Sequence, residues 1–262
     1  MSGRPTRFGL TRPTETEIAA GGFSTPWDAP MIPPFPFRFR NAEILTLYWR
    51  TDPDAIAFLL PPPLEPLGDV ACVHIYRMND PDWLGPYGEA NVMVGARLPG
   101  VAEGAFSPWL VLSSDAGVAH GREIHGQPKK LGTPAIEMRG DLIVGTVERN
   151  GIDVITGTMP YKQQPAEAAD LKPFFDFGTN INLKAVDHID GRPAIRQLTS
   201  RALTDVTVHE AWSGPCTVDL RGNAQLPVSR LPVLEPLRAF FWRADFTLVA
   251  GEIIHDYLEG GA

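Results

Sequence analysis

The sequence predicts a mainly antiparallel β fold with a few helices, whose strands close into a barrel or cone around a central cavity. Apolar and polar residues alternate with period two along much of the chain, and helix-like stretches are few. No strand-helix alternation typical of a parallel sheet is seen. The 25 glycines and 26 prolines are scattered, as expected for many short elements joined by turns. Closure of the strands would protect the edges of such a sheet.

The clearest predicted element is a β-hairpin in EMRGDLIVGTVERNGIDVITGTM. Asn150-Gly151 supplies the two left-handed positions of a tight turn between strands Ile143–Arg149 and Ile152–Thr158. Other segments with alternation or β-branched residues are predicted strands: Ala42–Trp49, Val70–Met78, Pro108–Ser113, Thr204–Trp212 and Glu252–Leu258.

Two short helices are predicted. The segment Asp52–Leu60 begins with a capping aspartate and is followed by three consecutive prolines that end a helix. The segment Asp115–Ile124 is the second candidate, and it leads directly into a stretch containing two lysines.

The first 35 residues are predicted to form an extended arm, and residues 36–262 a single domain. The arm ends in the apolar, proline-rich stretch MIPPFPF. Such a segment is too apolar to be left in water, so we expect it to pack on the body or on a neighbouring subunit. A homo-oligomer, a tetramer or larger, is therefore expected.

Composition excludes several functional classes. The 23 Lys and Arg against 31 Asp and Glu give a net charge of -8, which disfavours nucleic-acid binding. Two cysteines are too few for a disulfide scaffold or a cysteine-rich zinc site. No stretch resembles a signal peptide or a membrane span. These observations favour a cytoplasmic protein that contacts neither membrane nor nucleic acid.

The segment GREIHGQPKKLGTP (121–134) is the strongest candidate for chemistry. A pair of adjacent lysines usually lies in a solvated turn, and that alternative remains open. However, Pro128 fixes the backbone before Lys129, and Gly126 and Gly132 permit close chain approach. If the segment is extended, Lys129 and Lys130 point to opposite faces, and only one of them enters a cavity.

A lysine that attacks a carbonyl must be neutral. Lowering its pKa from about 10.4 to about 7 raises the neutral fraction about a thousandfold at pH 7 and requires ~4.6 kcal/mol. Burial of the ammonium group or a second cation beside it can supply this free energy.

The lysine segment resembles that of the acetoacetate decarboxylase family. Further stretches match in the family's order: YWRTDPDAIAFLLPPPLEP (48–66), LGPYGEA (84–90), LIVGTVERNGIDVITGTMPYK (142–162), TDVTVHEAWSGP (204–215) and IIHDYL (253–258). The resemblance implies a β-barrel-like fold, an oligomer and a cofactor-free Schiff-base mechanism, for which acetoacetate decarboxylase is itself the standard example. It implies that Lys129 forms the Schiff base, that Lys130 is its cationic neighbour and that Glu89 handles protons.

Two positions depart from the decarboxylase pattern. Ala42 stands where the decarboxylases carry an arginine near the substrate carboxylate, and His74 stands where they carry a second cavity glutamate. Both changes favour relatives that do not decarboxylate but act on 2-oxo acids through the same imine. Arg40, on the strand face of Ala42, and Gln127, beside the lysines, are the candidate replacements for the lost anchor.

Other polar residues have two interpretations each. His74 is a satisfied core histidine or a proton carrier, and His125 polarises the substrate or caps a turn. His255 and Tyr257 share a face of the last predicted strand, where either could move protons if it enters the cavity. The six histidines show no metal-ligand spacing, and no nucleotide-binding glycine motif is present, so no metal and no cofactor are predicted.

The sequence therefore predicts a Schiff-base lyase that acts on 2-oxo acids. In this hypothesis Lys129 condenses with pyruvate, and the enamine attacks an aldehyde with loss of water; the reverse direction hydrates a 2-oxo-3-enoic acid. Glu89, with His74 or Tyr257, carries protons. The alternatives are a decarboxylase of a β-keto acid that recruits Arg40, and a non-catalytic ligand-binding relative.

Overall fold

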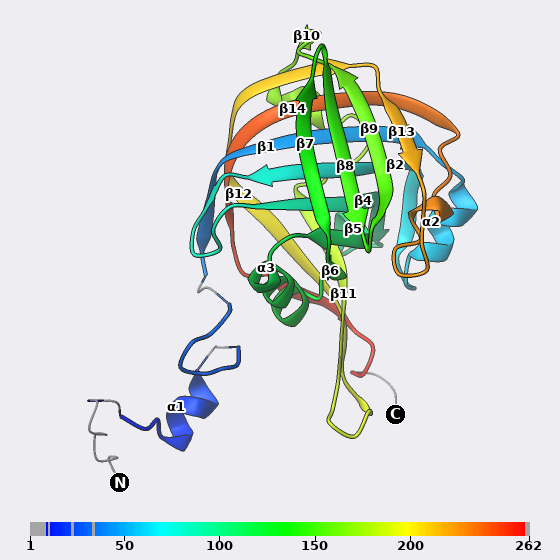
Figure 1. Ribbon diagram of the computed structural model, residues 1–262. Helices are drawn as coiled ribbons and strands as arrows, with labels where there is room; N and C mark the ends of the chain where they lie inside the picture. The colour runs from blue at the N-terminus through cyan, green and yellow to red at the C-terminus, as the bar shows by residue number, and fades with distance from the viewer. Residues whose placement is uncertain (1–8, 10, 22–23, 33–34, 260–262) are drawn as a thin grey trace. The chain divides into compact units, whose positions relative to one another are not determined.

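The computed structural model describes residues 9, 11–21, 24–32 and 35–259 (Figure 1). The chain divides into two units, residues 1–32 and 33–262. In the first unit, helix α1 (Glu15–Ala20) begins with a capping box, in which Thr14 and Glu17 bind each other's backbone N–H groups. Of the proline-rich stretch predicted to pack on the body, residues 33 and 34 lie outside the described residues.

The second unit is built on one large, closed sheet (Figure 1). Its strands pair in ring order, each with the next and the last with the first: β1 (Phe37–Arg50), β2 (Glu65–Met78), β4 (Tyr87–Leu98), β5 (Ala102–Leu112), β11 (Thr179–Asp187), β12 (Pro193–Gly214) and β14 (Glu235–Leu248). Neighbours are antiparallel except β5 and β11, which are parallel. The predicted mainly antiparallel β fold with few helices is therefore confirmed.

Four short strands attach to the ring: β3 (Asp80–Pro81), β6 (Lys129–Leu131), β10 (Gln164–Pro165) and β15 (Glu252–Asp256). Strand β6 runs parallel to β5 and carries the two adjacent lysines. Strand β15 pairs with β12 and ends at Asp256, two residues before the predicted end, because the chain turns at Tyr257.

A second, smaller sheet covers part of the outside of the ring (Figure 1). It contains β7 (Thr133–Arg139), β8 (Leu142–Arg149), β9 (Ile152–Pro160) and β13 (Thr217–Leu220), all antiparallel. Asn150 and Gly151 have φ of 56° and 76°, so the predicted hairpin turn is confirmed.

Alternation along the ring strands separates two apolar cores. On β1, Leu45 and Leu47 pack outward against the smaller sheet, whereas Ile44 and Tyr48 point into the ring. Gly145 of β8 and Gly157 of β9 face each other in the smaller sheet. A Cβ atom on Gly157 would lie 2.1 Å from a Leu47 methyl carbon, so the absence of side chains there permits the two sheets to approach.

The two predicted helices are present. Helix α2 (Pro53–Leu59) is capped by Asp52, and α3 (Asp115–His120) by Ser114. Contrary to the prediction, the second helix does not continue unchanged to residue 124: it becomes a single π-helical turn, Gly121–His125, which ends at Gly126 with φ of 75°. Turns of 3-10 helix occupy Ala168–Leu171 and Val228–Arg230. No helix in the described part of the chain has the length and apolarity needed to cross a membrane.

Because the two sheets lie close together, a larger side chain between them should destabilise the fold. A valine at Gly145 would overlap Ile75 and Leu45, because a Cβ atom there lies 2.6 Å and 2.8 Å from their terminal carbons. Overpacking of this kind costs about 1–3 kcal/mol, so Gly145→Val should lower the unfolding free energy by that amount in urea denaturation. Ile152→Val, on an exposed position of β9, is the control and should change it by less than about 0.5 kcal/mol.

Candidate active site

A small cavity opens on the inner face of the ring. Among the described residues, its charged lining consists of Glu89, Lys129 and Arg201. The rest of the lining is aromatic, aliphatic or neutral: Phe39, Tyr76, Met78, Tyr87, Gln127, Leu203, Phe246 and Leu248. These residues come from β1, β2, β4, β6 with the turn before it, β12 and β14, so closure of the ring is what brings them together.

The backbone around Lys129 directs its side chain into this cavity. Pro128 precedes β6, and the pairing of Lys129 with Leu110 fixes the position of the strand. The π-helical turn supplies Gly121, where a Cβ atom would lie 2.3 Å from Cδ of Lys129. The lysine stem therefore passes over a backbone position that must remain without a side chain.

Lys129 and Glu89 form a buried ion pair. The Lys129 Nζ atom donates to Glu89 Oε2 at 3.1 Å, and each residue is 7% exposed. Burial lowers the pKa of Lys129 from its usual range, and the charge of Arg201 lowers it further, whereas the Glu89 carboxylate opposes both. Because the net direction is downward, the amine is neutral over a wider pH range than that of an ordinary lysine.

Arg201 is the cavity residue that the sequence analysis missed. It lies on β12 opposite Asn180 of β11, and burial lowers the pKa of its guanidinium. Its Nε and Nη1 atoms are shielded from solvent and have no hydrogen-bond partner among the described residues. The predicted strand begins at Thr204, whereas β12 begins at Pro193 and includes Arg201, so no predicted element contains this residue.

A buried amide network holds the turn before Lys129. The Gln127 side chain donates to Asn180 at 3.2 Å, and Asn180 donates in turn to the Ser107 hydroxyl at 2.8 Å. Asn182 also donates to Asn180, at 3.1 Å. Gln127, predicted to bind substrate, therefore does line the cavity, although its amide is already engaged with β11.

His74 lies behind the cavity wall. Its Nδ1 is 2.9 Å from the hydroxyl of Tyr76, which lines the cavity, and its ring packs on Phe177 and Trp242. Burial lowers the pKa of His74 to about 3, so the imidazole is neutral at physiological pH. Burial raises the pKa of both cavity phenols, Tyr76 and Tyr87, which keeps them protonated.

The two lysines point in opposite directions, as predicted. Lys129 is buried, whereas Lys130 is half-buried and its ammonium donates to the backbone oxygen of Gln225 outside the cavity. Lys130 is therefore not the cation beside the reactive amine, contrary to expectation, because its ammonium lies outside the cavity. Arg201 is the cation whose charge lowers the pKa of Lys129.

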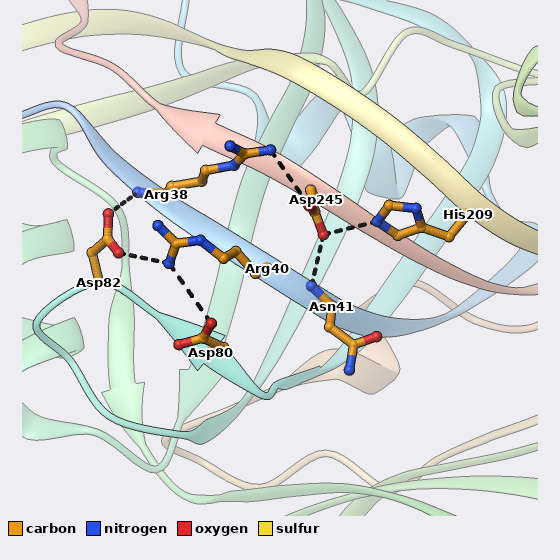
Figure 2. Close-up of polar contacts among 7 residues, drawn as sticks. All are labelled: Arg38, Arg40, Asn41, Asp80, Asp82, His209 and Asp245. Carbon is orange, nitrogen blue, oxygen red and sulfur yellow. Dashed lines mark hydrogen bonds and ion pairs between the residues drawn. The ribbon is translucent and has the colours of Figure 1, made fainter.

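Arg40 is also outside the cavity, contrary to its predicted place as a carboxylate anchor. Figure 2 shows its guanidinium directed at Asp82 and Asp80, with Nη1 at 2.7 Å and 3.7 Å from their carboxylates. The reason is a break in the alternation of β1: its register with β14 shifts between Phe39 and Ala42, and Asn41 has φ of 51°. In the same cluster His209 pairs with Asp245 at 2.9 Å (Figure 2).

The remaining candidates do not line the cavity either. His125 is buried against Phe35 and His120, and its pKa falls to about 2, chiefly through burial. The rings of His255 and Tyr257 make an edge-to-face contact, with centroids 4.6 Å apart, and the Tyr257 hydroxyl donates to the backbone oxygen of Pro62. His255 lies on the short strand β15 and Tyr257 directly follows it, and neither lines the cavity, so neither proton-carrying role fits its predicted place.

Comparison with known proteins identifies the family of this chain. The family model described as "Acetoacetate decarboxylase (ADC)" matches residues 23–258. The chain belongs to the acetoacetate decarboxylase family. It is 36% identical to acetoacetate decarboxylase 2 of Mesorhizobium japonicum over 241 residues, which is 92% of each chain.

Two solved structures agree with the fold. The crystal structure of acetoacetate decarboxylase from Legionella pneumophila matches with a TM-score of 0.81 and 35% identity, over 86% of this chain and 90% of that one. The enduracididine biosynthesis enzyme MppR, complexed with pyruvate, matches with a TM-score of 0.75 over 90% of this chain and 98% of that one. At 18% identity, this second likeness concerns the fold alone.

The two departures from the decarboxylase pattern have structural counterparts. Ala42 is fully buried on β1, where no charge reaches the cavity. The position of the second glutamate is taken by His74, which is neutral and hydrogen-bonded to Tyr76. In this chain, the cations that line the cavity among the described residues are Lys129 of β6 and Arg201 of β12. Among the described residues, no cluster of three or more histidine, cysteine or acidic side chains could hold a metal ion.

The buried histidines predict how the unfolding free energy depends on pH. Burial lowers the pKa of His74 and His120 to about 3 and that of His125 to about 2, whereas all three take up protons near pH 6.5 when unfolded. A depressed pKa contributes stability that is present above the unfolded pKa and is lost as pH falls toward the folded one. Each histidine should therefore cost about 1.4 kcal/mol of unfolding free energy per pH unit below 6.5.

This loss can be measured by urea denaturation between pH 6.5 and pH 4. His74→Asn keeps a side chain that can bind Tyr76 but does not titrate, so it should flatten the slope by about 1.4 kcal/mol per pH unit. An unchanged slope in this variant would contradict the assignment of His74 as a neutral, buried imidazole.

Proposed function

We propose that this chain is a Schiff-base lyase that decarboxylates a β-keto acid such as acetoacetate. The observation that carries the proposal is a lysine with a lowered pKa, Lys129, buried in a ring cavity beside the carboxylate of Glu89. A neutral amine in such a place is a nucleophile for a carbonyl carbon. Relatives at 36% identity over 92% of the chain are named acetoacetate decarboxylases, which supports the same reaction here.

In the proposed reaction, the Lys129 amine adds to the keto carbon, and water leaves to give an iminium ion. The bond to the carboxylate then breaks, carbon dioxide departs, and the electron pair enters the iminium to give a neutral enamine. Protonation of the enamine carbon and hydrolysis of the new iminium release the ketone and the free lysine. Glu89 contacts Nζ and is therefore placed to accept the proton of the Lys129 ammonium and later to donate a proton to the enamine carbon.

A second candidate is the aldolase-dehydratase or hydratase reaction on a 2-oxo acid. It is favoured by Ala42 and His74, which replace two charged residues of the decarboxylase pattern. A fold relative, MppR, binds pyruvate and the condensation product of pyruvate with imidazole 4-carboxaldehyde. In this reaction Lys129 forms the imine with pyruvate, C3 loses a proton instead of carbon dioxide, and the enamine attacks an aldehyde.

The covalent step common to both candidates is tested by trapping. Incubation with acetoacetate or pyruvate and borohydride should reduce one imine at Lys129, located by mass spectrometry. Lys129→Ala should abolish the adduct. Lys130→Ala is the matched control, because its ammonium lies outside the cavity, and it should keep the adduct. If no keto acid is trapped at Lys129, the chain is a non-catalytic ligand-binding relative.

The two reactions are separated by their products. With acetoacetate, we expect carbon dioxide release at a rate in the usual enzymatic range, about 1–1,000 per second, that is lost in Lys129→Ala. With pyruvate and an aldehyde, a conjugated enone absorbing in the near ultraviolet should not accumulate. Enone formation without carbon dioxide release would reverse the order of the two candidates.

A further inference from the structure

We infer that Arg201 binds the carboxylate of the keto-acid substrate and so selects charged acids over neutral ketones at this site. The inference rests on the proposed function, because it concerns the substrate of the Lys129 cavity. Its basis is a cation that lines the cavity and leaves Nε and Nη1 without a hydrogen-bond partner among the described residues.

The two guanidinium nitrogens of Arg201 that lack a hydrogen-bond partner in the described part of the chain are free to bind a ligand. Buried polar atoms are nearly always hydrogen-bonded, and leaving a charged donor unsatisfied is costly. The cavity's one lining carboxylate among the described residues, Glu89, is already hydrogen-bonded to Lys129. The two cavity phenols are kept protonated and so offer no compensating negative charge. The guanidinium therefore has donors available for an incoming anion.

The charge balance of the cavity also favours the binding of an anion. When the Lys129 nitrogen is positively charged, as in the iminium of the proposed reaction, the lining carries two cations and one anion, so the substrate's single carboxylate makes the cavity neutral. A guanidinium can offer a carboxylate two parallel N–H donors, which fixes the orientation of the acid as well as its charge. Holding the acid group at Arg201 would leave the keto carbon to Lys129.

The position of Arg201 explains how this chain lacks the family's arginine without lacking a cavity cation. Ala42 stands at the position of that arginine on β1, and Arg201 approaches the cavity from β12. Closure of the ring through β14, which pairs with both strands, brings these two positions to the same interior. The carboxylate would thus be held from a different side of the cavity.

An alternative role for Arg201 is to lower the pKa of Lys129 without touching the substrate. The two roles differ in what they do to a neutral ligand. A carboxylate anchor matters for an acid and not for its ester, whereas a residue that only tunes the lysine affects both to the same extent. The effect on the lysine would also disappear at high pH, where the amine is neutral in every variant.

The test compares pyruvate and acetoacetate with their methyl esters in borohydride trapping, using the full chain. In Arg201→Gln the apparent affinity for each acid should fall about 10- to 100-fold relative to its ester. Arg97→Gln removes a surface arginine paired with Glu65 and is the control, with no change in this ratio. If acid and ester fall by the same factor in Arg201→Gln, the anchor is disproved.

Steady-state kinetics give a second readout if acetoacetate is turned over. A cation that holds the ground-state carboxylate loses its partner as carbon dioxide leaves, so at high pH, where the Lys129 amine is neutral in both proteins, Arg201→Gln should raise KM without lowering kcat. A fall in kcat with KM unchanged at that pH would contradict the anchor. If Arg201→Gln fails to fold, Arg201→Lys replaces it, because it keeps the charge but loses the paired donors and should still weaken the acid more than the ester.

Anion binding can also be measured without any reaction. Butyrate has the chain of acetoacetate but no keto group, so it cannot form an imine. Calorimetry should show butyrate binding to the wild-type protein, weakened in Arg201→Gln. This result would support the anchor even if trapping failed for every keto acid, in which case the Schiff-base function fails alone. Equal binding, or none, in both proteins would overturn the anchor.

Discussion

The chemistry of this cavity depends on the pKa of Lys129, which opposing interactions raise and lower. Removing the ammonium group from water favours the neutral amine, and the positive charge of Arg201 acts in the same direction. The carboxylate of Glu89, 3.1 Å away, favours the ammonium. Each pKa unit of displacement corresponds to about 1.4 kcal/mol, so small changes in cavity charge alter the fraction of reactive amine considerably. A keto-acid anion bound at Arg201 would add another charge to this balance.

The ring of strands brings these charged groups together, because it assembles the cavity from distant parts of the chain. Glu89 comes from β4, Lys129 from β6 and Arg201 from β12. The π-helical turn and Gly121 then admit the lysine stem, and the amide network through Asn180 holds the neighbouring turn. The same closure places the apolar side chains that exclude water from the amine.

The sequence predicted local structure well because local structure depends on local patterns. The Asn150-Gly151 hairpin, the Asp52 cap and the opposite facing of the two lysines follow from turn chemistry, capping and strand alternation. Arg40 was misplaced for the same reason. Strict alternation put it on the face of Ala42, but the register shift near Asn41 turns it toward Asp82.

Long-range placement could not be read from local patterns. Arg201 lies 72 positions after Lys129 in the chain and reaches the cavity through strand pairings that no short motif encodes. His255 and Tyr257 were predicted to share a strand face, but β15 ends at Asp256, before Tyr257, and neither residue lines the cavity. The family resemblance indicated Lys129 and Glu89 because their motifs match, whereas Arg201 lies outside every segment that carries the resemblance.

The central claim, that the Lys129 amine is neutral over a wider pH range than that of an ordinary lysine, is tested most directly by measuring its titration. Competitive labelling with a small amine-reactive reagent, read by mass spectrometry as a function of pH, reports the pKa of individual lysines. The account predicts that Lys129 titrates below the ordinary value of 10.5, and that Glu89→Gln lowers its pKa further. A Lys129 pKa at or above 10.5 would contradict it.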